Sequence, residues 1–104
     1  MDITIRRTEV FSAWLRGVPD KQTRNVITAR LGRLAQGNPG DAKSAGGGVW
    51  ELRIDFGPGY RVYYVQRGST IVLILCGGDK STQKADILRV RRLAAEWKEN
   101  SEWL

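Results

Sequence analysis

The sequence predicts a small α+β domain in which the elements follow the order β-αα-βββ-α. Its central part, residues 46–83, reads as three strands joined by glycine-containing turns. Two amphipathic helical patterns precede this part and one follows it. Because 104 residues suffice for one hydrophobic core, we expect a single domain over residues 1–104.

A short strand and two helices are expected first. Apolar and polar residues alternate over residues 2–7, which is typical of a strand. Thr8 is a suitable N-cap for a first helix that ends by Pro19, and Asp20 is a suitable N-cap for a second that runs to about Gln36. The short connection between them predicts a helical hairpin packed on one face of the sheet.

A glycine-rich segment separates the hairpin from the sheet. Residues 37–48 contain five glycines and no large aliphatic or aromatic side chain. Such a composition lacks the alternating apolar residues of a strand. We therefore expect a mobile loop here.

The three central strands are predicted from alternation and from turn residues. Residues 49–56 alternate between an apolar set (Trp50, Leu52, Ile54 and Phe56) and a polar set that we expect to face solvent (Glu51, Arg53 and Asp55). The glycines and proline of residues 57–59 end this strand, and residues 60–66 form the next. Residues 71–76 are uninterruptedly apolar, as in a strand covered on both faces.

The last element is a helix that begins at Ser81 or Thr82, with the uncapped residues 99–104 expected to fray. The fold expected from all these elements is a small, mostly antiparallel sheet with the hairpin on one face and a C-terminal helix.

The charge balance favours an anionic partner. The chain has 17 basic and 11 acidic residues, a net charge of +6, and residues 1–45 carry eight of the basic and four of the acidic ones. Such a surface suits nucleic acid or an acidic protein, although a solvated basic surface accounts for it equally well.

Several classes of function are disfavoured by what the chain lacks. It has no histidine, which removes the histidine-based triads and the commonest zinc ligand. Cys76 is the one cysteine, so no internal disulfide forms, and at the end of an apolar strand we interpret it as a small core residue. No apolar run has the length of a membrane span and no signal-peptide core is present, so we expect a cytoplasmic protein without a metal site or cofactor.

Candidate functional residues cluster on the central strands. Arg53 and Arg61 lie on adjacent strands, and Lys80 follows the next one, so the three basic groups are expected to converge over one face of the sheet. Guanidinium groups bind phosphate bidentately and stabilise charge on a phosphoryl group. Four carboxylates stand nearby in the sequence: Glu51, Asp55, Asp79 and Asp86.

Aromatic and basic residues near this cluster are candidates for RNA binding. Tyr60 and Tyr63 are possible stacking surfaces for bases, and Lys84 and Arg89 lie on the outer side of the last helix. The alternative is that Arg53 pairs with a neighbouring carboxylate and that Arg61 extends over the aromatic residues.

Three motifs, taken in order, are similar to those of the RelE/ParE toxin superfamily. They are WELR at residues 50–53, GYRVYY at residues 59–64 and GGDKSTQ at residues 77–83. More narrowly, the chain resembles the HigB-like addiction module killer proteins, over nearly its whole length. The element order deduced above is also that of this family.

The resemblance implies a toxin of a type II toxin–antitoxin module, neutralised by a cognate antitoxin. RelE-type members act on the ribosome and cleave messenger RNA without a metal, through attack of a ribose 2′-hydroxyl on the adjacent phosphate. ParE-type members share the fold and inhibit DNA gyrase without catalysis. A basic nucleic-acid-binding domain that is not toxic is the third alternative.

The resemblance also implies roles for single residues. Arg61 matches the arginine that stabilises the transition state, and Arg53 and Lys80 match basic residues on the preceding strand and after the last one. The chain departs from RelE at Glu51, where RelE has a lysine, and at Asp86, near its late tyrosine.

Because arginine is a poor general base, proton removal would fall to Asp86, to Glu51 or to water, with Lys80 as proton donor. We expect Arg61→Ala to abolish toxicity and to leave folding intact.

Overall fold

The computed structural model describes residues 3–68 and 71–99 and has the α+β architecture that the sequence predicts, with one strand more. The elements are β1 (Thr4–Arg7), α1 (Glu9–Gly17), α2 (Lys21–Ala35), β2 (Ala42–Gly46), β3 (Val49–Ile54), β4 (Tyr60–Arg67), β5 (Ile71–Asp79), the 3-10 helix η1 (Lys80–Thr82) and α3 (Gln83–Glu99). Of the residues predicted to fray, Glu99 ends α3, and 100–104 lie outside the described residues.

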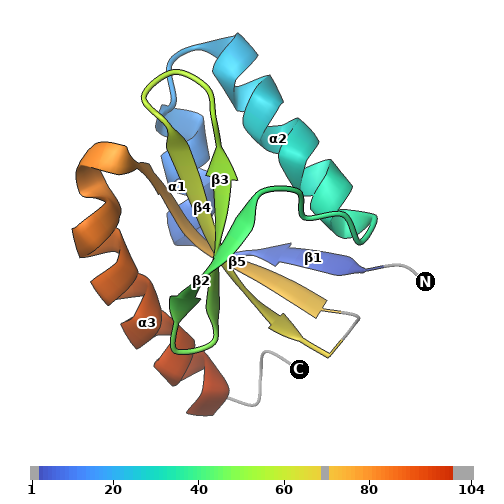
Figure 1. Cartoon of the computed structure of the whole chain (residues 1–104), viewed down its shortest axis with the longest axis vertical. Helices are drawn as coiled ribbons and strands as arrows, with labels where there is room; N and C mark the ends of the chain where they lie inside the picture. Colours follow the sequence, from blue (N-terminus) through green and yellow to red (C-terminus); the bar gives the residue numbers. More distant parts are fainter. Residues whose placement is uncertain (1–2, 69–70, 100–104) are drawn as a thin grey trace.

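One five-stranded sheet, in the order β1-β5-β4-β3-β2, forms the centre of the molecule (Figure 1). Neighbouring strands are antiparallel except β1 and β5, which pair in parallel. Helices cover both faces. The hairpin of α1 and α2 packs on one face through a cluster that contains Phe11, Ile27 and Leu52, and α3 packs on the other through Tyr63, Val90 and Trp97.

The predicted helix caps are confirmed. The hydroxyl of Thr8 accepts a hydrogen bond from the backbone N–H of Phe11 at 3.0 Å, which satisfies a free donor of the first turn of α1. The carboxylate of Asp20 does the same for the N–H groups of Gln22 and Thr23 in α2. These two caps fix where the hairpin begins and turns.

The expectation of a mobile loop over residues 37–48 is wrong in part, because β2 forms there as the edge strand of the sheet. Its small residues give no apolar signal, but its backbone pairs with β3, and Ala45 is buried. The guanidinium of Arg91 on α3 donates to the Ala45 carbonyl at 2.8 Å. The strand is thus held by contacts that a local sequence pattern does not encode.

The prediction that Glu51 on β3 faces solvent is also wrong. Glu51 is only 3% exposed, because α3 covers this face of the sheet. Trp50, which we placed on the apolar face, is 42% exposed and lies outside the cluster beneath the hairpin. Strand alternation separates two faces correctly and does not say which positions a helix will cover.

The strand β5 continues three residues beyond Cys76, to Asp79, so Gly77 and Gly78 belong to the sheet and not to a turn. Both positions need glycine for space. A Cβ on Gly77 would collide with the indole of Trp14 on α1, and one on Gly78 would collide with the carboxylate of Asp86 on α3. Side chains from the helices on the two faces therefore come into tight contact with the sheet at this pair of residues.

Candidate phosphate-binding site

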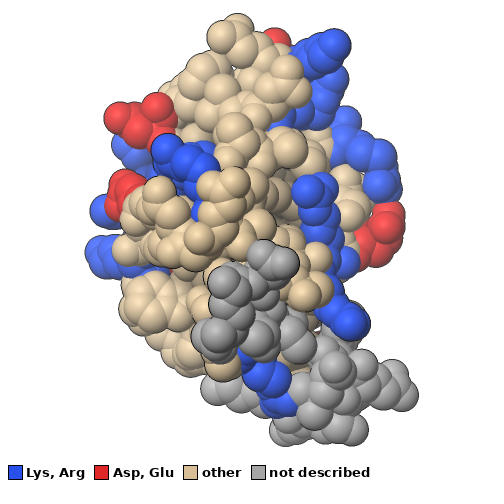
Figure 2. All heavy atoms as spheres, turned by 90° about the vertical axis from the view of Figure 1, so that its right-hand side faces the viewer, with Lys and Arg blue, Asp and Glu red and all other residues tan. Residues whose placement is uncertain are grey.

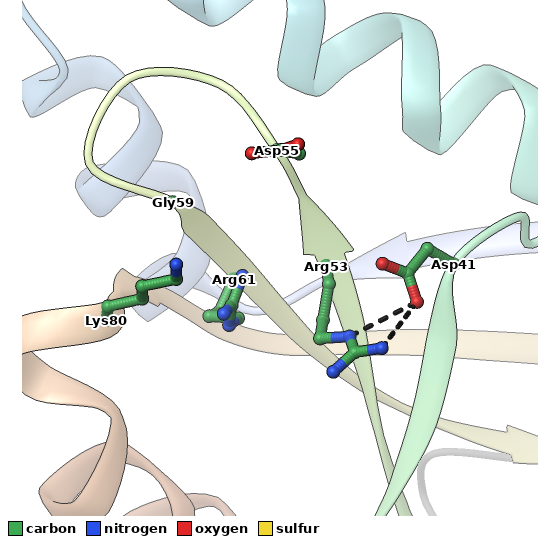
Figure 3. Close-up of a pocket in the computed structure, with 6 residues that line it drawn as sticks. All are labelled: Asp41, Arg53, Asp55, Gly59, Arg61 and Lys80. Carbon is green, nitrogen blue, oxygen red and sulfur yellow. Dashed lines mark hydrogen bonds and ion pairs between the residues drawn. The ribbon is translucent and has the colours of Figure 1, made fainter.

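A pocket of about 260 Å³ opens where the turn between β3 and β4 meets η1 (Figure 3). The residues that line it are Asp41, Arg53, Asp55, Gly59, Arg61 and Lys80. Figure 3 shows Lys80, Arg61 and Arg53 in a row across the strands, with Asp41 beyond Arg53. The structure thus brings together the three basic residues singled out in the sequence.

Arg53 is held by the carboxylate of Asp41, which precedes β2. Its Nε and one terminal nitrogen lie 3.2 and 2.9 Å from the same oxygen of Asp41, and this hydrogen bonding raises the pKa of Arg53. Arg30 of α2 donates to the carbonyls of Arg53 and Pro39 at 2.8 and 3.0 Å. The hairpin thereby ties the segment that carries Asp41 to the end of β3.

Arg61 occupies the middle of the row and is 8% exposed. In the sheet it lies directly opposite Arg53 on β3 and Gly78 on β5. Its Nε is 4.0 Å from an oxygen of Glu51, and a terminal nitrogen donates to the Tyr60 carbonyl at 3.3 Å. Because Gly78 has no side chain, no side chain from the paired position on β5 packs beside the guanidinium of Arg61.

Lys80 is placed by a glycine and by a helix cap. Its methylene groups pack against Gly59, where a Cβ would lie 3.0–3.1 Å from three of them. Asp79 caps η1: its carboxylate accepts from the N–H and hydroxyl of Ser81, and its own N–H donates to Thr82. The hydrogen bonds that the carboxylate accepts, that of the Ser81 hydroxyl foremost, lower the pKa of Asp79.

Tyr63 does not offer a stacking surface for RNA, because it is buried between β4 and α3. Its hydroxyl donates to Glu51 at 3.1 Å, and the side-chain amide of Gln83 donates to the same oxygen of Glu51 at 2.8 Å. Burial, followed by the charge of Glu51, raises the pKa of Tyr63 well above its usual range. The phenol therefore stays protonated and acts as a donor.

Two further residues expected at the site point elsewhere. Asp86 does not line the pocket; its carboxylate accepts from the Thr82 hydroxyl at 2.6 Å and lies against Gly78. Tyr60 packs its ring edge-on against Trp14, with centroids 6.2 Å apart, on the side of the hairpin. Lys84 and Arg89 are exposed on α3, and their contact with RNA stays a prediction.

Asp41 lines the pocket although it was not among the residues predicted for the site. It stands in the glycine-rich segment that we predicted to be a loop, 12 residues before Arg53. Only the pairing of β2 with β3 brings the two side chains together. Because no strand was predicted at residues 37–48, the local sequence carried no signal that Asp41 would lie beside Arg53.

Basic side chains predominate on one face of the molecule (Figure 2). Figure 2 shows that Lys and Arg side chains cover more of one face of the molecule than Asp and Glu side chains do. Within residues 3–68 and 71–99, no group of three or more Cys, Asp and Glu side chains is arranged to hold a metal ion. In the same residues, no helix combines the length and the apolar character that crossing a bilayer requires.

The chain is similar to known proteins over most of its length. The family described as "Phage derived protein Gp49-like (DUF891)" matches residues 13–96. An uncharacterised protein of Haemophilus influenzae is 47% identical over 96 residues, which are 92% of this chain and 97% of that protein. All residues that line the pocket, from Asp41 to Lys80, lie within both matches.

Proposed function

This chain belongs to the family of phage-derived Gp49-like proteins, and from that premise we propose that it is the toxin of a type II toxin–antitoxin module. The family is of the RelE/addiction-module killer type. The activity we propose is metal-independent cleavage of messenger RNA on the ribosome, with a cognate antitoxin as the second partner.

The observation that carries the proposal is the row of Lys80, Arg61 and Arg53 around one small pocket. At about 260 Å³ the pocket is below the roughly 300–1,000 Å³ typical of sites for drug-sized ligands. It suits a single phosphate whose nucleotides remain outside. Two guanidinium groups and an ammonium group match the charge of a phosphate and of the pentacoordinate phosphorane that forms from it.

The proposed reaction is an internal transesterification. The ribose 2′-oxygen bonds to the adjacent phosphorus, the bond from phosphorus to the 5′-oxygen breaks, and a 2′,3′-cyclic phosphate and a 5′-hydroxyl result. Arg61 would stabilise the charge on the phosphoryl oxygens, and Lys80 would give a proton to the departing 5′-oxygen.

The residues that line the pocket lead us to assign a different acceptor for the proton of the 2′-hydroxyl. Neither Asp86 nor Glu51 lines the pocket, whereas Asp41 and Asp55 do. Because Asp41 accepts two hydrogen bonds from Arg53, we assign the proton to Asp55 or to a water next to it.

The test is brief induction in cells, followed by mapping of the 5′ ends of messenger RNA, with Arg61→Lys as the inactive control. New ends within translated frames that are absent in the control support the proposal. Growth arrest with intact messages contradicts it and favours gyrase as the target. Absence of arrest also contradicts it and leaves a basic nucleic-acid-binding domain.

A further inference from the structure

A buried carboxylate lies behind the pocket. Glu51 on β3 is 3% exposed and is surrounded by the sheet and by α3. Burying a carboxylate is unfavourable unless hydrogen bonds and an opposite charge compensate it. Here the hydroxyl of Tyr63 and the amide of Gln83 both donate to one oxygen, Oε2.

The opposite charge belongs to Arg61. Its Nε is 4.0 Å from the same Oε2, which is too far for a hydrogen bond and within the range of an ion pair. This Nε is buried and has no hydrogen-bond acceptor among the described residues. The guanidinium is thus held from behind by charge while its other side borders the pocket.

The need for such a support follows from the sheet register. Arg53 and Arg61 face each other directly across β3 and β4, and like charges in that relation repel. The negative charge of Asp41, which lies on the exposed side of Arg53, offsets the positive charge of Arg53. The negative charge of Glu51, which lies diagonally across the strands from Arg61 on its buried side, offsets the positive charge of Arg61.

We propose that Glu51 is a positioning residue, which Tyr63 and Gln83 fix in place so that its charge holds the guanidinium of Arg61 toward the pocket. The consequence for RNA cleavage rests on the function proposed above, but the placement of Arg61 does not. In this role Glu51 neither touches the phosphate nor accepts a proton.

The variant that tests this is Glu51→Gln, which keeps the shape of the side chain and an oxygen for Tyr63 but removes the charge. The matched control is Tyr64→Phe, since Tyr64 lies on the neighbouring strand β4 and is buried on the opposite face of the sheet, away from the pocket.

The first readout is the Nε–H signal of Arg61 in the ¹H–¹⁵N spectrum, assigned by its loss in Arg61→Lys. We expect the signal to shift and its exchange with water to quicken in Glu51→Gln and to stay unchanged in Tyr64→Phe. An unchanged signal in Glu51→Gln overturns the proposal.

The second readout is the binding of inorganic phosphate to the purified protein. If Glu51 only added negative charge near the pocket, its removal would strengthen binding. Positioning predicts weaker binding, by about three- to tenfold, since misplacement of a fixed charge outweighs the lost repulsion. Tighter binding in Glu51→Gln contradicts the proposal.

The third readout is cleavage on programmed ribosomes. We expect kcat to fall by roughly 10- to 100-fold with little change in KM, because ribosomal contacts govern binding and Arg61 acts in the transition state. If the wild type cleaves and Glu51→Gln cleaves equally well, the proposal fails and the function stands. If the wild type does not cleave, the function fails, and the spectrum and the phosphate titration still decide the proposal.

Tyr63→Phe keeps the charge of Glu51 and removes one of its two donors, so it covers the case in which Glu51→Gln does not fold. We expect a smaller change of the Arg61 signal in the same direction. No change in Tyr63→Phe counts against the support that we describe.

Discussion

Arg53 and Arg61 occupy directly opposite positions on two antiparallel strands, each with a carboxylate of its own. The pair costs stability through repulsion, which the flanking carboxylates of Asp41 and Glu51 offset. Proteins keep such an arrangement where a site needs concentrated charge.

Arg61→Ala is expected to destabilise the fold by about 3–5 kcal/mol, because it leaves Glu51 buried without its opposite charge. This corrects the expectation that the variant folds normally, which took no account of the burial of Arg61. Arg61→Lys keeps a positive charge near Glu51, so its free energy of unfolding should fall much less. Denaturant unfolding of both variants checks the difference, and equal stabilities would contradict it.

Asp41→Asn is expected to strengthen phosphate binding by about two- to fivefold, because it frees Arg53 from an exposed ion pair. Glu9→Gln is the matched control, since Glu9 forms an exposed ion pair with Arg16 on α1. Titration with inorganic phosphate at low ionic strength measures both. Weaker binding in Asp41→Asn would show that Arg53 requires Asp41 for its placement.

Gly78→Ala is expected to destabilise the protein by about 1–3 kcal/mol, because the added methyl group would collide with Asp86 and Thr82. Gly32→Ala serves as the control: nothing lies near its Cβ position within α2, so it should stabilise by about 0.5–1 kcal/mol. Thermal or urea unfolding distinguishes the two signs.

Acid is expected to remove the contribution of Asp79 to stability. Its pKa is lowered in the folded state, first by the Ser81 hydroxyl, so its contribution is present above the ordinary value of 3.8 and is lost as the pH falls through the lower folded value. Asp79→Asn should therefore have a lower melting temperature than the wild type at pH 7, and this difference in melting temperature should become smaller below about pH 3.8. A gap that does not change with pH would contradict this.

Cys76 is expected to resist alkylation at neutral pH in the folded protein. It is buried beneath α3, and burial, with the nearby charge of Asp86, raises the pKa of its thiol to about 12. Since the thiolate is the reactive form, iodoacetamide should label Cys76 only after denaturation. Rapid labelling of the native protein would show that α3 opens readily.

Local chemistry determined the parts of the fold that the sequence predicted correctly. Thr8 and Asp20 cap the helices because their side chains reach backbone groups two or three residues away. The three central strands follow from alternation and from the glycines between them.

The parts that sequence analysis missed depend on packing between distant segments. No pattern in residues 42–46 reveals that their backbone completes the sheet. The coverage of Glu51 by α3, and the turning of Asp86 away from the pocket, depend equally on where that helix rests. The convergence of Arg53 and Arg61 was foreseeable because a tight turn joins their strands, whereas Asp41 needed the additional strand.

The parallel pairing of β1 with β5 also has a consequence for synthesis. Residues 4–7 are synthesised well before residues 71–74, their partners in the sheet, and both hairpin helices and the strands β2, β3 and β4 are made in between. The long separation makes this contact late and entropically costly to form. Lys80, the last cation of the pocket, follows directly after β5. The last strand of the sheet and the last cation of the pocket are therefore synthesised together, and a translation product that ends before Ile71 lacks both.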